Sequence, residues 1–194
     1  MSLESTVPNY PELSLGDFLD LVASREPAPG GGAAAAVTVA LAAALSSMSA
    51  RFSTDHLVEA LTLTERAEQL RSEVMPLARA DAAAYGRVLE AYRSPQEEPW
   101  SIREALSEAA SVPLSVAEIG AEVAGIAVRL VREGNPNLKG DGVAAVELAA
   151  AGVRAAARLV ELNVSAGGAD DGRLARASEL VADAAAAQQA SNGA

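Results

Sequence analysis

The sequence contains no cysteine among its 194 residues and a single histidine, His56. Disulfides, thiolate zinc sites and cysteine nucleophiles are therefore excluded, and a zinc site would lack a second histidine. Aromatic residues make up only 3% of the chain, and β-branched runs are sparse. Alanine, the strongest helix former, dominates instead, so the composition predicts an all-α protein whose helices pack closely through small side chains.

Basic residues are also few, with 15 lysines and arginines against 26 acidic residues and a net charge of −11. Phosphate backbones are bound mainly by basic surfaces, so we expect no nucleic-acid partner. The longest apolar segment, residues 33–50, is mostly alanine with a threonine and three serines inside it. A membrane span needs about 20 strongly apolar residues, so a buried helix is the expected role of this segment. The opening residues lack a basic region followed by an apolar one, so we expect no signal peptide. We therefore expect a cytoplasmic protein with no membrane partner.

Apolar residues recur at steps of three and four along most of the chain, which predicts a bundle of five or six helices. The predicted helices cover about residues 15–24, 32–52, 55–92, 100–132, 142–164 and 172–189. Pro76 and Pro113 lie inside two of them and are expected to kink or break those helices. No repeat or linker divides the chain, so residues 1–194 are predicted to form one domain, with flexible ends at 1–11 and 190–194.

The stretch PAPGGGAAAA places Gly30, Gly31 and Gly32 at the start of the second predicted helix. The first amides of a helix lack intrahelical partners, and the helix dipole makes that end electropositive. Glycines leave these amides accessible, so an anion such as a carboxylate or phosphate is a natural ligand. The alternative is a tight turn that brings the helix close to a neighbour, and spacing alone slightly favours this alternative.

Asp81 falls on the apolar face of the third predicted helix, in register with Leu77 and Ala84, and Tyr85 follows one turn later. A carboxylate at a core position costs free energy unless it is paired or hydrogen-bonded. Asp81 is therefore a candidate for a shifted pKa and for proton transfer. The alternatives are an acid bonded to a neighbouring serine and one at the edge of the apolar stripe.

The stretch GNPNLKGDG connects the fourth and fifth predicted helices. In its structural interpretation, Gly134 ends one helix, Asn135 and Asn137 form Asx turns, and Asp141 caps the next helix. A polar loop between apolar helices is also a common place for ligand contacts, and Lys139, the one lysine of the chain, lies in it. The residues alone leave both interpretations open.

Three stretches together resemble the cyclodeaminase/cyclohydrolase family of folate enzymes, over about residues 12–165. They are PAPGGGAAAAVTVALAAALSSMSARFS, then DAAAYGRVLEAYRSP with IREALSEAASVPL, and GNPNLKGDGVAAVELAAAGVRAAARLVELNV. This family includes the C-terminal domain of formiminotransferase-cyclodeaminase and bacterial methenyltetrahydrofolate cyclohydrolases. The resemblance implies an all-helical homodimer with folate in a cleft. It also implies chemistry at the N5/N10 one-carbon bridge, with no cofactor beyond tetrahydrofolate as substrate carrier and no metal.

The resemblance also implies roles for individual residues. Asp81 would be the acid/base or the group that stabilises a cationic carbon, and the amides of residues 30–32 would contact an anionic or carbonyl group of folate. The other expected substrate-binding residues are Tyr85, Asn135, Asn137, Lys139, Asp141 and Asn163. Many family members carry a lysine-rich turn after the second helix, whereas this chain has STDHLVEA at residues 53–60.

Two classes of function follow. The first is an enzyme, either a 5-formiminotetrahydrofolate cyclodeaminase, which is an ammonia lyase, or a 5,10-methenyltetrahydrofolate cyclohydrolase. The second is a non-catalytic helical homologue that binds a small anion or a partner protein, and the absent lysine turn favours it. A purely structural dimer is a third possibility, because small-residue helices suit tight packing.

Overall fold

The computed structural model describes residues 8–93, 99–168 and 172–193. Within these ranges the chain is built from helices and has no strand, which confirms the all-α prediction. The elements are η2 (Tyr10–Glu12), α1 (Leu15–Ala23), α2 (Gly31–Arg51), α3 (Ala60–Arg93), α4 (Pro99–Glu133), η3 (Pro136–Leu138), α5 (Lys139–Gly167) and α6 (Arg173–Asn192).

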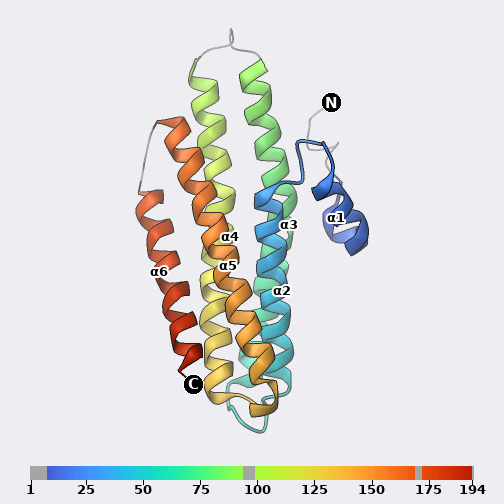
Figure 1. Cartoon of the computed structure of the whole chain (residues 1–194), viewed down its shortest axis with the longest axis vertical. Coiled ribbons are helices and arrows are strands. Elements are labelled where there is room, and N and C mark those ends of the chain that lie inside the picture. Colours follow the sequence, from blue (N-terminus) through green and yellow to red (C-terminus); the bar gives the residue numbers. More distant parts are fainter. Residues whose placement is uncertain (1–7, 94–98, 169–171, 194) are drawn as a thin grey trace.

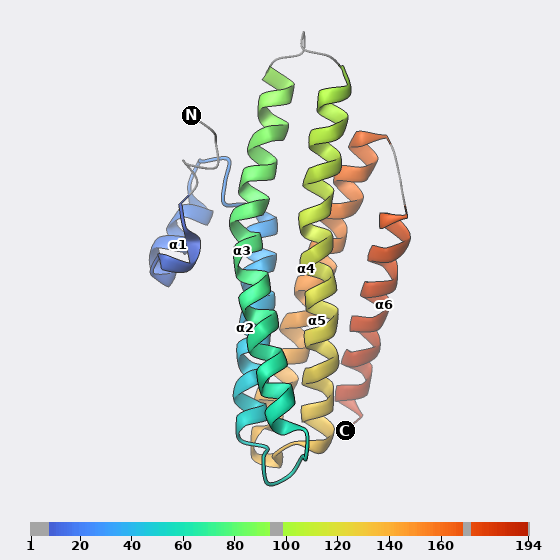
Figure 2. The ribbon, with the colours of Figure 1, turned by 180° about the vertical axis from the view of Figure 1, so that it is seen from behind.

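The long helices run alternately down and up one bundle (Figure 1). Helix α2 packs against α3, α4 and α5, and α6 packs against α4 and α5. Helix α1 lies beside the bundle near the start of α2 in both views (Figures 1 and 2). The α4–α5 connection lies at the opposite end of the bundle, beside the connection between α2 and α3.

Small residues allow the central helices to approach one another closely. A Cβ added at Gly152 of α5 would lie 2.5 Å from Cγ2 of Val39 on α2. One added at Gly120 of α4 would lie 2.7 Å from Cγ2 of Val153. Both valines are fully buried. The two glycines therefore bring the backbones of α2, α4 and α5 together around a dense core of alanine and valine.

Helix α2 is the one helix in the described ranges that is long and apolar enough to cross a membrane, with a mean hydropathy of 1.7. Of that apolar window, 61% is buried inside the bundle. Two polar side chains of α2 bond to carbonyls of the helix itself. Thr38 Oγ1 donates to the Ala34 carbonyl at 2.8 Å and Ser46 Oγ to the Ala42 carbonyl at 2.9 Å.

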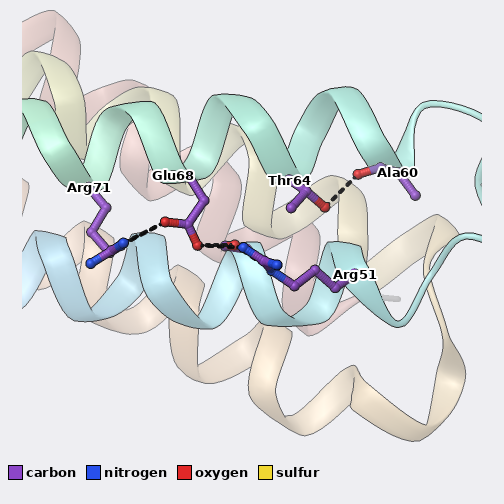
Figure 3. A network of polar contacts seen from close by, with 6 residues as sticks. Arg51, Ala60, Thr64, Glu68 and Arg71 are labelled. Atoms are coloured by element: carbon purple, nitrogen blue, oxygen red, sulfur yellow. Dashed lines mark hydrogen bonds and ion pairs between the residues drawn. The ribbon is translucent and has the colours of Figure 1, made fainter.

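A polar network fixes α2 against α3 near the connection between these two helices (Figure 3). The Glu68 carboxylate accepts hydrogen bonds from Ser47 Oγ at 2.7 Å, from Arg51 at 3.0 Å and from Arg71 at 2.6 Å. The bonds from Arg71 and Ser47 are the main cause that lowers the pKa of Glu68 to about 2. Thr64 is satisfied locally, because Oγ1 donates to the Ala60 carbonyl at 2.8 Å.

Several predicted boundaries differ from the structure. Helix α4 is continuous through Pro113, so this proline does not break it. Helix α3 begins at Ala60 rather than near residue 55, because the chain from Phe52 first makes tight turns in which His56 and Leu57 N–H groups bond the Ser53 carbonyl. Helix α6 continues to Asn192, beyond its predicted end at 189.

Candidate active site at the start of helix α2

The glycine run forms a helix start that no side chain caps. Gly30 is the N-cap residue of α2, and the first intrahelical bond runs from the Ala34 N–H to the Gly30 carbonyl at 3.1 Å. The N–H groups of Gly31, Gly32 and Ala33 therefore have no carbonyl partner within the helix. They form an electropositive end that can bind an anionic or carbonyl group.

Asp81 of α3 lies directly against this helix start. A Cβ added at Gly32 would lie less than 3.0 Å from all three atoms of the Asp81 carboxyl group. The N–H of Ala33 donates a hydrogen bond to that carboxyl group. Only glycine at residue 32 leaves room for this contact, so the two helices position Asp81 together.

Burial gives the Asp81 carboxyl an unusual proton affinity. Removal from solvent raises the pKa of Asp81 to about 6, and the hydrogen bond from Ala33 opposes this rise. At neutral pH the group is mostly ionised, but its protonated form is easily reached. A carboxyl with a pKa near the working pH is suited to both accepting and donating a proton.

A cavity of about 380 Å³ opens in front of these groups. The predicted site residues that line it are Gly30, Gly31, Gly32, Asp81, Tyr85 and Asn163. Leu159 and Leu162 of α5 add apolar wall, and Tyr85 and Leu162 remain 45% and 52% exposed. The cavity therefore combines a few convergent polar groups with apolar surface, as small-molecule sites of roughly 300–1,000 Å³ do.

Tyr10 is a neighbour of this site that the sequence did not predict. It lies in a segment predicted to be flexible, yet it is only 4% exposed and its ring meets Phe18 of α1 edge-on, with 5.7 Å between centroids. Burial raises the pKa of Tyr10 first, and the negative charge of Asp81 raises it further, while Arg79 lowers it. Its phenol therefore lies within electrostatic reach of Asp81. In the sequence, Tyr10 is an isolated aromatic residue before a proline, and no pattern there indicates that it packs near Asp81.

The loop with the remaining predicted site residues lies at the other end of α2. The Asn135 backbone N–H donates to Ser53 Oγ at 2.9 Å, and Asn135 Nδ2 donates to the Phe52 carbonyl at 3.0 Å. Phe52 follows the C-terminus of α2, a helix of 21 residues that spans about 30 Å. Within one chain, residues 135–141 are therefore about one helix length from the glycines and from Asp81.

The local structure of this loop confirms one expected turn and corrects a cap. Asn135 Oδ1 accepts from the Asn137 N–H at 3.0 Å, as expected for an Asx turn. Helix α5 begins at Lys139 with Leu138 as its N-cap, and no side chain caps it. Asp141 therefore does not cap α5. It lies in the first turn, where its charge suits the helix dipole.

Within the described ranges, no group of three or more histidine, aspartate and glutamate side chains is placed to hold a metal ion. The chemistry that this site can perform with its own groups is proton transfer at Asp81, beside donors from the helix start. Asn163 contributes a side-chain amide, and its Nδ2 donates to the Ala109 carbonyl of α4 at 3.0 Å.

Comparison with known proteins agrees with this arrangement. The family model of formiminotransferase-cyclodeaminase matches residues 14–188. A methenyltetrahydrofolate cyclohydrolase of Methylorubrum extorquens is 36% identical over 167 residues, which is 79% of this chain and 79% of that protein. A formimidoyltransferase-cyclodeaminase of Mus musculus is 33% identical over 135 residues, which is 60% of this chain and 25% of the mouse protein.

A solved structure shares the whole fold. The crystal structure of formiminotetrahydrofolate cyclodeaminase from Thermotoga maritima matches with a TM-score of 0.87 and 30% sequence identity, covering 95% of this chain and 96% of that chain. The sequence match and the fold thus agree over nearly the full length. The chain belongs to the formiminotransferase-cyclodeaminase family.

Proposed function

We propose that this protein is a folate-dependent one-carbon enzyme that acts on the N5/N10 bridge of tetrahydrofolate. It is a 5-formiminotetrahydrofolate cyclodeaminase or a 5,10-methenyltetrahydrofolate cyclohydrolase, as its relatives are named. The observation that carries the proposal is the position of the Asp81 carboxyl, which lies against the uncapped start of α2 and lines a cavity. Burial raises the pKa of this carboxyl to about 6.

Both reactions involve the cationic carbon that bridges N5 and N10, and in this proposal Asp81 acts at that carbon. In the hydrolytic direction, water adds to the methenyl carbon, Asp81 accepts a proton from that water, and the C–N5 bond breaks as N5 gains a proton. In the deaminating direction, N10 attacks the carbon of the protonated formimino group, Asp81 passes the N10 proton to the NH₂ nitrogen, and the C–N bond to that nitrogen breaks as it leaves as ammonia. In both, the carboxylate also stabilises the positive charge on the bridge carbon.

The remaining cavity groups supply binding and orientation. Gly31 and Gly32 line the cavity, and in this proposal their N–H groups donate to a carbonyl or anionic group of folate. Tyr85 and Leu162, half exposed at the cavity, offer apolar surface to the planar ring system. Tetrahydrofolate is the carrier in this proposal, and no further cofactor takes part in it.

We further propose that the enzyme acts in the cytoplasm as a homodimer whose partner copy completes the cavity. The free face of α2 exposes Leu41 at 54%, and Phe52 at its end is 63% exposed. Two copies packed antiparallel along α2 would bring each loop 135–141 to the other copy's glycine run. Asn135, Asn137, Lys139 and Asp141 would then reach folate from the partner chain.

The proposed function is tested by following the methenyl absorbance with two substrates. A rise from 5-formiminotetrahydrofolate identifies the cyclodeaminase, and an accelerated decay of 5,10-methenyltetrahydrofolate identifies the cyclohydrolase. Asp81→Asn should lose most turnover while Asp183→Asn, an exposed acid on α6, keeps it. No rate above background with either substrate would overturn the enzyme assignment. Folate binding by calorimetry without turnover would instead support the non-catalytic homologue.

A further inference from the structure

Pro113 leaves a carbonyl of α4 without its helical partner. Proline has no N–H, so the carbonyl one turn earlier, that of Ala109, receives no intrahelical bond. Pro113 is fully buried and Ala109 is 6% exposed. A buried carbonyl without a donor costs free energy, so the Ala109 carbonyl needs a donor from elsewhere in the protein.

Asn163 of α5 provides that donor. Its Nδ2 donates to the Ala109 carbonyl at 3.0 Å, and both residues line the cavity in front of Asp81. Pro76 of α3 offers a contrast, because it is exposed and the carbonyl that it frees belongs to Ser72, another exposed residue, where solvent can reach it. Of these two prolines, only Pro113 leaves a buried carbonyl that needs a hydrogen bond from a side chain at the site.

The bond also decides which end of the Asn163 amide is free. The Ala109 carbonyl can accept a hydrogen bond only from the NH₂ group of the Asn163 amide, so Oδ1 takes no part in this bond. In the described part of the chain no hydrogen bond to Oδ1 is present, and Ser49 Oγ is the one fully buried side-chain polar atom there without a partner. Asn163 Oδ1 is therefore accessible, in a residue that lines the cavity.

We propose that Pro113 is a positioning residue for the active site. By freeing the Ala109 carbonyl, it holds the Asn163 amide so that Oδ1 is presented to the substrate as a hydrogen-bond acceptor. The proposal rests on the folate function proposed above. It adds that the substrate places an N–H or O–H donor at Asn163, in the same cavity that Gly31 and Gly32 line.

The proposal is tested by returning an N–H to position 113. Pro113→Val restores the bond from residue 113 to Ala109 while nearly conserving buried volume, so Asn163 loses its fixed partner. We expect KM for 5,10-methenyltetrahydrofolate to rise about fivefold, the effect of one hydrogen bond, with kcat changed less. Pro76→Val is the matched control and should leave KM unchanged.

A double-mutant cycle separates positioning from general damage to α4. Asn163→Ala should raise KM at least as much, and adding Pro113→Val to it should have no further effect, because both changes remove the same group. Additive effects of the two substitutions on KM would overturn the proposal. Thermal unfolding of each variant checks that the bundle remains folded.

Nuclear magnetic resonance gives a readout that does not depend on turnover. The Asn163 side-chain amide signal, assigned by its loss in Asn163→Ala, should exchange slowly with solvent in the natural protein and rapidly in Pro113→Val. Rapid exchange in the natural protein would overturn the positioning role. Slow exchange that Pro113→Val abolishes, in a protein without turnover, would keep the positioning role and refute the folate function alone.

Discussion

The carboxyl group of Asp81 occupies the space that a side chain at Gly32 would need. All three of its atoms lie less than 3.0 Å from where a Cβ at residue 32 would stand. The glycine at this position therefore serves packing and chemistry at once. It lets an acid on α3 reach the first amides of α2, and it excludes any larger residue from that contact.

Gly32→Ala should displace Asp81, while Gly31→Ala should not. A Cβ at Gly31 would meet only Leu159 Cδ1 at 3.9 Å, an ordinary contact. Overpacking at residue 32 should lower the free energy of unfolding by about 1–3 kcal/mol. Misplacing Asp81 should also lower kcat/KM roughly a hundredfold. Urea unfolding and methenyl turnover measure the two effects. Equal stability of both variants would contradict the predicted contact between Asp81 and residue 32.

Turnover should depend on a single ionisation near pH 6. Asp81 begins the hydrolytic reaction as a carboxylate, and burial raises its pKa to about 6. The rate of methenyl hydrolysis above background should therefore be half-maximal near pH 6 and fall about tenfold for each unit of pH below that value. The profile of kcat/KM between about pH 3 and pH 8 provides the measurement, because this range covers both the raised and the ordinary aspartate pKa. A transition near the ordinary aspartate pKa would show that the reacting group is not buried Asp81.

Asp81→Asn should stabilise the protein at neutral pH. The folded pKa of Asp81 is raised to about 6, so ionisation in the folded state is disfavoured. The resulting destabilisation is absent below the unfolded pKa, near 4, and is complete above pH 6. Removing the charge should raise the free energy of unfolding by up to about 3 kcal/mol at pH 7.5 and by little at pH 4. Urea unfolding at the two values of pH tests this, and a loss of stability at pH 7.5 would contradict it.

The features that the sequence predicted are those set by local pattern. Apolar spacing located the long helices, the glycine run located the start of α2, and the position of Asp81 on an apolar face indicated a buried acid. Each of these depends on neighbours within a few turns of one helix. Helix α6 extends beyond its predicted end at residue 189, because the alanine and glutamine residues there are strong helix formers.

The features that could not be predicted depend on contacts between distant segments. Tyr10 becomes a neighbour of Asp81 only because the N-terminal segment packs on α3, which no periodicity indicates. The separation of Asn135 from the glycines could have been anticipated, since a predicted helix of about 20 residues lies between Gly32 and Phe52. A buried proline in a helix also signals an unpaired carbonyl, but only the fold identifies Asn163 as its partner.

Glu68→Gln should weaken the bundle at neutral pH but not in acid. Hydrogen bonds from Arg71, Ser47 and Arg51 lower the pKa of Glu68 to about 2. A lowered pKa stabilises the fold above the unfolded pKa, near 4.3, and this stabilisation is lost as the pH falls towards 2. The Glu68 side chain is 33% exposed, so solvent screening reduces the expected loss at pH 7 to about 1 kcal/mol.

The measurement is urea unfolding of the natural protein, of Glu68→Gln and of Glu90→Gln, an exposed glutamate on the same helix. The difference between the natural protein and Glu68→Gln should shrink as the pH falls from 5 towards 2, and Glu90→Gln should match the natural protein at neutral pH. A difference that stays constant into acid would mean that Glu68 holds α2 against α3 by its shape and neutral hydrogen bonds. In that case its charge would not be the source of the stabilisation.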